Sequence, residues 1–465
     1  MNHDPLILSA FTMSTVSHGN TGLWRHPDDR TAGYTTLPYW VDLARRLDAG
    51  GFDLLFIADA VGQLDVYGGN ARAALAHGVQ TPVTDPLLAV SAMAAATERL
   101  GFGVTVSTTY EHPYLLARKF STLDHLTGGR IGWNIVTSLL DSAARNIIAR
   151  DRQIGHDERY AIAQEFLEVT YKLWEGSWED GAVLRDRERG IFTDPDKVHD
   201  IGHAGKYFSV PGAHLVEPSP QRTPLLLQAG TSPAGRVFAA RNAELVFVAD
   251  PRPEVLRRNI ADIRAQAVGL GRRPEHIKFI TSVTVVVDST DQAAQAKAND
   301  LRRFRDTRGG LVLLSALSGV DWSEHDLDRP IEQFETDASR SVLAAVDDPT
   351  VRRRVTLREY VDGLSGFGGE VLVGSATTVA DALEAYAETT GVDGFNFVYL
   401  TTPGSFDDLA EHLIPELRRR GRAREHTDAR TIREAIFAGG PRLPHDHPAA
   451  GYRRLPVTST SGASR

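Results

Sequence analysis

Eight short apolar segments, each followed by a stretch with helical periodicity, constrain the fold of this chain more than any other feature of its sequence. Their composition and length are typical of strands buried on both faces of a parallel sheet. The intervening sequence has apolar residues at helical spacing, as in Pro38–Ala49, Pro86–Thr97 and Glu158–Trp174. This alternation predicts an α/β fold of the (β/α)8 TIM-barrel type, with insertions. The eight segments are Leu6–Thr12, Phe52–Ala58, Gly101–Ser107, Ile131–Val136, Pro224–Ala229, Leu245–Ala249, Lys278–Val287 and Gly394–Leu400.

The domain organisation follows from the stretches in which this alternation of strand and helix patterns is interrupted. We expect a single barrel domain over residues 1–420 and a C-terminal extension over residues 421–465 that wraps the surface. Residues 176–221 are rich in Gly, Asp, Pro and His, which favours an ordered excursion or a partly strand-forming loop. Residues 300–374 contain a charged run and then a Gly-rich stretch, which favours a helical insertion followed by a mobile linker. Loops this long are usually lids or binding elements.

Missing residue types and motifs exclude several kinds of chemistry. The chain has no cysteine, which excludes disulfides, a thiolate nucleophile and cysteine-ligated zinc or iron–sulfur centres. A GxGxxG after a strand, a GxxxxGK[ST] and an HExxH are also absent. His199 and His203 are four residues apart, but their Gly-rich context favours a loop, and we expect no metal site. Any redox chemistry must therefore come from a bound cofactor.

Charge and hydropathy predict a cytoplasmic protein with neither a nucleic-acid nor a membrane partner. The net charge is −9 and no long basic block occurs, unlike in nucleic-acid-binding proteins. Asp4 stands where a secretory signal would carry Lys or Arg. No apolar run approaches the ~20 residues that a membrane-spanning helix needs.

A strand end and a helix start meet in the sequence QAGTSPAGRVFAA (228–240). Ser232 has the character of an N-cap and Pro233 that of the first helical residue. Free backbone N–H groups and the helix dipole, with the hydroxyls of Thr231 and Ser232, form a ready anion site beside Gly230. An ordinary capped helix is the alternative. A serine-hydrolase elbow is disfavoured, because Gly-x-Ser-x-x-Gly is one residue too long.

A second group, His156 and Tyr160, lies four residues apart at the start of a predicted helix. Side chains at this spacing project from one face, so the pair could hold a phosphate or orient a substrate. An ordinary surface pair is the alternative.

Polar residues also recur at the ends of predicted strands: Asp59, Thr105, Ser107, Asn134 and Thr137. The carboxyl ends of barrel strands line the catalytic mouth, which makes these residues candidates for binding, although they could merely cap the strands.

Aromatic, polar and cationic residues directly after the first strand are suited to contact with a substrate, or else belong to a surface loop. These are His18, Trp24, Arg25 and His26. The residues expected around a substrate mix apolar and polar character and therefore do not identify it. They are Phe11, His18, Trp24, Tyr67, Gln80 and the Gly309–Ser315 segment.

Several long motifs, in a fixed order, resemble those of the bacterial luciferase-like flavin monooxygenases. The similarity runs from about residue 3 to about residue 455, and is greatest to the branch that holds nitrilotriacetate, dimethyl-sulfide and dibenzothiophene-sulfone monooxygenases. The motifs are GLWRHPDDR (22–30), FDLLFIADAVG (52–62), TLDHLTGGRIGWNIVTS (122–138), HDERY (156–160), KLWEGSW (172–178) and SPQRTPLLLQAGTSPAGRVFAA (219–240).

This resemblance implies a barrel that uses FMN in its reduced form, FMNH2, delivered by a separate NAD(P)H-dependent flavin reductase. O2 would add to the flavin to give a flavin 4a-(hydro)peroxide, which oxygenates a small or medium organic substrate such as an organosulfur compound or an amine. Relatives of this kind are commonly homodimers or homotetramers. The alternatives are a flavin- or deazaflavin-binding protein without oxygenation and a deazaflavin-dependent reductase on the same barrel.

The resemblance also assigns roles to residues. It places Asp59 and Thr105 near the flavin ring, Asn134 and Thr137 in the fourth-strand motif, and His156 and Tyr160 at the flavin tail. The phosphate cradle would be Gly230, Thr231 and Ser232. We expect His18 and Asn134 to take part in catalysis.

The expected phosphate site has an unusual position in the order of the strands. A barrel phosphate site usually follows strands seven and eight, whereas the segment Pro224–Ala229 is fifth. Either residues 176–221 hide a further strand or insertions displace the later ones.

Overall fold

Eight parallel strands close into a barrel at the centre of the computed structural model, which describes residues 4–250, 252–328, 356–363, 371–425, 429–437 and 439–454. Each strand pairs with its neighbours, and the pairs β1–β13 and β10–β11 complete the ring. All eight overlap the predicted segments, so the predicted (β/α)8 barrel is confirmed. They are β1 (Ile7–Met13), β2 (Leu54–Ala58), β3 (Gly101–Ser107), β4 (Ile131–Val136), β9 (Leu225–Ala229), β10 (Leu245–Phe247), β11 (Lys278–Asp288) and β13 (Gly394–Val398).

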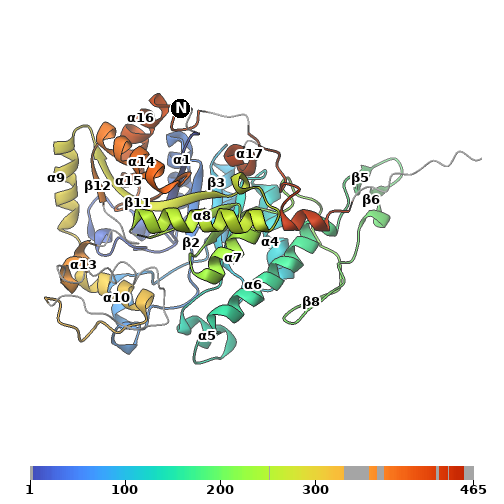
Figure 1. Ribbon diagram of the computed structural model, residues 1–465, viewed down its shortest axis with the longest axis horizontal. Coiled ribbons are helices and arrows are strands. Elements are labelled where there is room, and N and C mark those ends of the chain that lie inside the picture. Colours follow the sequence, from blue (N-terminus) through green and yellow to red (C-terminus); the bar gives the residue numbers. More distant parts are fainter. Residues whose placement is uncertain are drawn as a thin grey trace, which may run out of the picture.

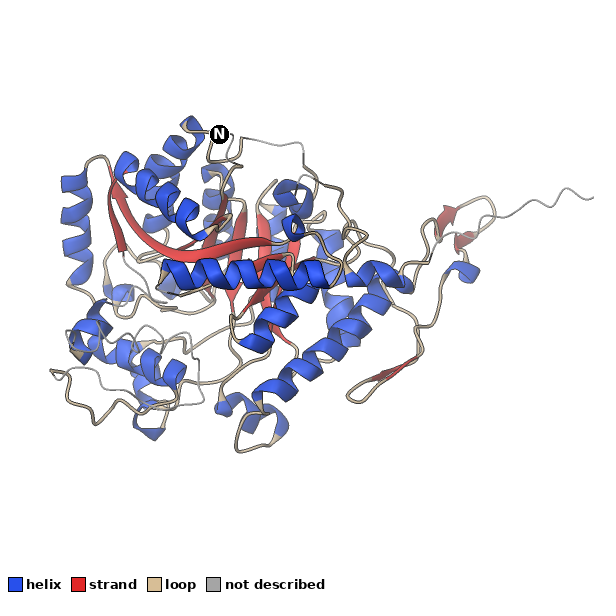
Figure 2. Cartoon of the chain, in the orientation of Figure 1, coloured by secondary structure: helices blue, strands red, loops and turns tan. Residues whose placement is uncertain are grey.

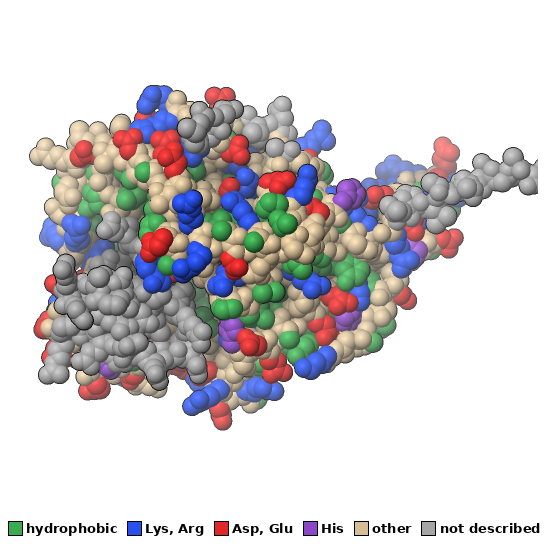
Figure 3. Space-filling view, viewed as in Figure 1, with side chains coloured by type: hydrophobic (Ala, Val, Ile, Leu, Met, Phe, Trp, Pro, Cys, Tyr) green, Lys and Arg blue, Asp and Glu red, His purple; other side chains and the backbone are tan. Residues whose placement is uncertain are grey.

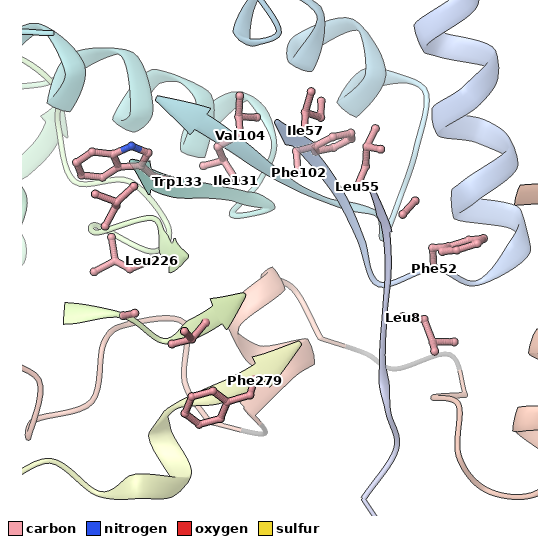
Figure 4. Close-up of a cluster of buried hydrophobic side chains, with 14 of the residues drawn as sticks. Leu8, Phe52, Leu55, Ile57, Phe102, Val104, Ile131, Trp133, Leu226 and Phe279 are labelled. Atoms are coloured by element: carbon pink, nitrogen blue, oxygen red, sulfur yellow. The ribbon is translucent and has the colours of Figure 1, made fainter. Parts of the chain in front are cut away.

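Helices surround the strands (Figure 2). The strand side chains that point outward form the larger apolar core with them, and Figure 4 shows Leu55, Phe102 and Trp133 in this layer. Burial on both faces explains why the strands are continuous apolar runs. The helices of this outer layer are α1 (Leu37–Gly50), α3 (Leu87–Ala95), α4 (Pro113–Leu126), α6 (His156–Tyr171), α7 (Pro233–Asn242), α8 (Pro253–Gly269), α14 (Ala376–Thr390) and α16 (Ile414–Arg419).

The barrel interior holds a second apolar core, and the C-terminal segment closes the end of the barrel at which the strands begin. Ile432 and Ile436 of α17 (Ile432–Phe437) are buried in the same cluster as Ile7 and Leu54. A Cβ atom at Gly101 would lie 2.0 Å from Ile432 Cδ1, so this strand start must be glycine for the helix to dock. The expectation that the segment after residue 420 only wraps the surface is wrong for α17.

The excursion at residues 176–221 forms two antiparallel hairpins and adds no strand to the barrel. One pairs β5 (Val183–Asp186) with β6 (Ile191–Thr193), the other β7 (His203–Ala204) with β8 (Ser209–Val210). They project away from the barrel body (Figure 1). The strand β9 is therefore truly fifth, and the hypothesis of a barrel strand hidden in this excursion is wrong.

The second excursion contains helices, as the sequence predicts, and also one strand that the sequence did not predict. α9 (Asp291–Arg302), α10 (Thr307–Ser318) and α13 (Leu357–Gly363) follow β11, and α10 packs against α13 and against α2 (Arg72–His77) from the loop after β2. β12 (Val371–Ser375) pairs with the far end of β11. Most of the Gly-rich stretch expected to be a linker lies outside the described residues. The remaining short helices are α5 (Asp141–Ile148) and α15 (Gly404–Asp408).

Two surface properties bear on partners. Among the helices that the structure describes, none combines the length and the apolar character that a membrane span requires. Basic and acidic side chains are interspersed over the visible face (Figure 3).

Candidate active site

The carboxyl ends of β3 and β4 bring two predicted residues into direct contact. Thr105 and Asn134 are register partners on these strands, and Asn134 Nδ2 donates a hydrogen bond of 2.8 Å to Thr105 Oγ1. Asn134 Oδ1 is buried and has no hydrogen-bond partner among the described residues. A buried acceptor without a donor is costly, so this oxygen is suited to an N–H or O–H group of a ligand.

A second polar pair lies nearer the mouth on the same two strands. Ser138 Oγ donates to Ser107 Oγ over 2.8 Å. Ser138 has a φ of 54°, a left-handed conformation that is uncommon outside glycine and is often found at functional sites. The adjacent carbonyl of Thr137 accepts from Thr109 Oγ1 over 2.7 Å. Sequence reasoning missed Ser138, because nothing in the sequence marks a serine for this conformation.

The predicted helix start at Ser232 is confirmed. Ser232 caps α7, its Oγ accepts from the backbone N–H of Gly235 over 3.1 Å, and Pro233 is the first helical residue. The carbonyl of the preceding Thr231 accepts from Arg236 Nη1 over 2.7 Å, which fixes the turn. The side chain of Ser232 caps only the N–H group of Gly235. The other N–H groups of the first turn and the positive end of the helix dipole therefore remain available to a ligand.

His156 and Tyr160 meet Ser232 from the start of α6. His156 Nε2 lies 3.3 Å from Ser232 Oγ, and the centroids of the His156 and Tyr160 rings are 5.1 Å apart. Burial raises the pKa of the Tyr160 phenol, while its hydrogen bond with Ser232 and the nearby Arg159 charge act in the opposite direction. The phenol therefore stays a neutral donor at physiological pH. The two segments that the sequence marked separately form one cluster, here called the anion cradle: His156, Tyr160, Gly230, Thr231 and Ser232.

Gly230 keeps the anion cradle open. Its φ of 141° is a backbone conformation that L side chains rarely adopt. A Cβ atom there would lie 3.2 Å from the Tyr160 hydroxyl and 3.0 Å from Gln228 Nε2. A side chain at this position would thus fill the approach to the cradle.

Arg159, which sequence reasoning missed, places a positive charge beside Tyr160 of the anion cradle. Its Nη1 donates to the carbonyl of Thr137 over 3.3 Å, and its buried Nε has no partner among the described residues. Burial lowers the pKa of this guanidinium, although the arginine stays charged. Residue 159 is three positions after His156 and so shares its helix face, a spacing that could have identified it.

Asp59 follows β2 directly and is half-buried. Burial raises the pKa of its carboxyl to about 7, a hydrogen bond from the backbone of Ala60 lowers it, and the Asp85 charge raises it further. The carboxyl can therefore hold or release a proton near neutral pH. A carboxyl with such a raised pKa at the carboxyl end of a barrel strand is typical of functional groups.

His18 is buried beside the end of β1, only 3% exposed, and its ring lies edge-on to Phe11 with centroids 4.6 Å apart. Burial lowers its pKa to about 3, so the imidazole is neutral at physiological pH. Gln80 Nε2 donates to the His18 carbonyl over 2.9 Å, which joins three of the residues expected around a substrate.

The other residues expected around a substrate border the loop that ends at Gln80, since Trp24 lies beside Gly78 and Gly309 beside Val79. Trp24 is 38% exposed, while Tyr67 and the Gly309–Ser315 segment pack within the helical excursion. His199 and His203 contact separate carboxylates, Glu179 at 2.7 Å and Glu165 at 3.3 Å. In the described part of the chain, no group of three or more His, Cys, Asp or Glu side chains is arranged to hold a metal ion.

Comparison with known proteins places this site in a family. The model of the luciferase-like monooxygenase family matches residues 19–394. The chain belongs to this family. It is 47% identical to dimethyl-sulfide monooxygenase of Hyphomicrobium sulfonivorans, over 99% of this chain and 96% of that protein. It is 45% identical to long-chain alkane monooxygenase of Geobacillus thermodenitrificans, over 96% and 98% of the two chains. The predicted resemblance is thus confirmed, and the chain is an enzyme of the luciferase-like monooxygenase family.

Solved structures of the family agree with the fold. The crystal structure of the Hyphomicrobium sulfonivorans enzyme has a TM-score of 0.92 at 47% identity, over 98% of this chain and 97% of that one. A riboflavin lyase, solved with modified FMN and riboflavin, has a TM-score of 0.89 at 35% identity, over 97% and 100%. An F420-dependent alcohol dehydrogenase, at 16% identity and a TM-score of 0.56, shares the fold alone.

Proposed function

We propose that this enzyme is the oxygenase of a two-component system. It would take FMNH2 from a separate NAD(P)H-dependent flavin reductase and use O2 to oxygenate a small or medium organic substrate, such as an organosulfur compound or an amine. A separate reductase is consistent with the sequence, which lacks the glycine-rich fingerprint of a dinucleotide-binding unit. A homodimer or homotetramer and a cytoplasmic location remain predictions.

The observation that carries the proposal is the anion cradle at the carboxyl end of the barrel. Ser232 at a helix N-terminus meets His156 and Tyr160, and the positive charge of Arg159 acts on Tyr160. The adjacent Gly230 leaves room for a ligand because it lacks a Cβ atom. Such a helix start binds phosphate with its backbone N–H groups. The donor set therefore fits the terminal phosphate of FMN.

The polar wall formed by β3 and β4 fits the other end of the same cofactor. Asn134 Oδ1 lacks a donor, and the ring system of reduced FMN carries N–H groups at its edge. Reduced FMN, when bound, supplies the electrons with which O2 is activated. In this proposal Thr105 holds the Asn134 amide in place, Asp59 holds or moves a proton, and His18 stays an uncharged part of the reaction space.

The test has a binding stage and a reaction stage. The enzyme is titrated anaerobically with FMNH2, with reduced deazaflavin as a parallel titrant, and O2 is then admitted with dimethyl sulfide, alkanes or dibenzothiophene sulfone present. We expect FMNH2 to bind more tightly than deazaflavin and a product carrying one oxygen atom to form. Tight FMNH2 binding without any oxygenated product would favour a flavin-binding protein. Preference for deazaflavin would indicate the reductase alternative, and absence of FMNH2 binding would refute the proposal.

A further inference from the structure

Three aromatic rings form an apolar floor beneath the barrel mouth, here called the aromatic floor: Phe11 of β1, Phe56 of β2 and Phe247 of β10. Their ring centroids are 5.2 Å apart for Phe11 and Phe56, 5.7 Å for Phe11 and Phe247, and 6.2 Å for Phe56 and Phe247. Their register partners across the sheet include Val398 and Ala229, which are also apolar. The three rings therefore present aromatic carbon atoms to a ligand above them.

The walls around the aromatic floor carry no charge. Side chains alternate between the two faces of a strand, so the residues in register with Phe11, and every second residue from them along each strand, point into the barrel. On the eight barrel strands, all of which the structure describes, these positions hold apolar, hydroxyl and amide side chains, except at the two ends of β11. Lys278 at its start is paired with Asp393 over 3.1 Å, and Asp288 at its end, where β11 pairs with β12, is paired with Lys297 over 3.4 Å. The polar ones gather on β3 and β4, as in Thr105, Ser107 and Asn134.

The titratable groups around the aromatic floor offer an ionic substrate little counter-charge. Arg159 lies beside Tyr160 of the anion cradle, and Asp250 after β10 is paired with Arg252 over 3.0 Å. Burial raises the pKa of the Asp59 carboxyl after β2 to about 7, so that this group is uncharged below that pH.

The His18 ring, packed on Phe11, is neutral because burial lowers its pKa to about 3. Arg25 Nη2 donates to the carbonyl of Phe304 over 2.5 Å, and Arg145 is paired with Asp65. Transfer of a carboxylate or ammonium group onto apolar surface without a partner is strongly unfavourable.

The polar and apolar parts of the barrel mouth thus suit two different ligands. The anion cradle and the β3–β4 wall match the phosphate and the polar ring edge of a flavin, which leaves the aromatic floor for the second ligand. We propose that the substrate is an uncharged, predominantly apolar molecule that contacts Phe247 and Phe11, and that charged chelators, amino acids and protonated amines are excluded. This inference rests on the proposed function and narrows its substrate class.

The test compares three thioethers that differ at one end. Butyl methyl sulfide is uncharged, 3-(methylthio)propanoate carries a carboxylate, and 3-(methylthio)propylamine is an ammonium ion at neutral pH. Each is titrated into the enzyme–FMN complex while the flavin absorbance is followed. We expect the uncharged sulfide to bind at least ~100-fold more tightly than either ion. Equal or tighter binding of an ion, or no saturable binding of the uncharged sulfide, would overturn the inference, whereas failure of FMN itself to bind would instead refute the proposed function.

A positive charge placed on the aromatic floor should shift the binding preference from the uncharged sulfide to the carboxylate analogue. Phe247→Lys is expected to raise the affinity of the propanoate at least tenfold and to lower that of butyl methyl sulfide, with the FMN dissociation constant unchanged. Phe192→Lys on the projecting hairpin, where this ring is 62% exposed, is the matched control and should change neither affinity. If the lysine variant does not fold, Phe247→Leu should weaken butyl methyl sulfide binding at least threefold and leave FMN binding unchanged. An unaltered sulfide affinity in a folded Phe247 variant would show that the floor does not bind substrate.

Discussion

Ser232 has two separable functions, and replacing it with alanine measures both. Its Oγ accepts the hydrogen bond that caps α7, and in the proposed complex the same hydroxyl donates to the FMN phosphate. Loss of an N-cap costs about 1 kcal/mol of stability. Loss of a hydrogen bond to a charged group costs ~1.5–3 kcal/mol, which raises the FMN dissociation constant by about 10- to 150-fold.

The matched control is Thr290→Ala. Thr290 caps α9 with a bond of the same length, 3.1 Å to the backbone N–H of Ala293, but on a helix that contributes nothing to the anion cradle. Urea unfolding should show a similar loss of stability in both variants, because both remove a cap. Titration with FMN should show weaker binding only for Ser232→Ala. A Ser232→Ala protein that is destabilised like the control yet binds FMN normally would refute the phosphate role.

Three further perturbations test the site and its support. The raised pKa of Asp59 means that, between about pH 4 and about pH 7, the folded state binds a proton that the unfolded state has lost. The contribution of this carboxyl to the stability of the fold is therefore present below about pH 4 and is lost as the pH rises to about 7. Asp59→Asn should raise the free energy of unfolding at about pH 8 and change it little at about pH 4, and equal effects at both pH values would contradict this. Gly101→Ala should destabilise the fold by ~1–3 kcal/mol through its clash with Ile432, and Ile432→Ala in the same chain should recover part of the loss; no recovery would show that the clash lies elsewhere. Arg433→Met leaves the buried Glu244 carboxylate, 2.7 Å from Arg433 Nε, without its paired guanidinium, and should lower the free energy of unfolding in urea by ~3–5 kcal/mol. Arg419→Met removes an exposed guanidinium from Glu416 and should change the free energy of unfolding little. Similar losses in the two variants would contradict the role of the buried pair.

Local patterns in the sequence predict much of this structure. Strands such as β3 and β4 were located at their observed bounds, because burial on both faces forces a continuous apolar run. Ser232 and Pro233 also act locally, since a cap and a first-turn proline need only their own helix. The pairing of His156 with Ser232, by contrast, depends on how two distant helices pack, and the family resemblance rather than the residue pattern linked them.

Features that depend on contacts between distant parts of the chain could not be predicted from a single segment. The contact between Thr105 and Asn134 requires the register of β3 on β4, which periodicity does not define. β12 was missed because its short apolar run stands beside glycine-rich sequence and gains its pairing only from the unusual length of β11. α17 was missed because a six-residue helix in a polar tail has a weak signal, and its place depends on the space that Gly101 leaves in the barrel.

In the proposed function, this chain uses FMNH2 to insert one atom of O2 into an uncharged substrate. The most direct measurement mixes the anaerobic enzyme–FMNH2 complex with 18O2 and butyl methyl sulfide and follows the label by mass spectrometry. We expect a product that carries one 18O atom, with the second atom recovered in water. A product without the label, or hydrogen peroxide as the sole fate of the O2 consumed, would contradict it.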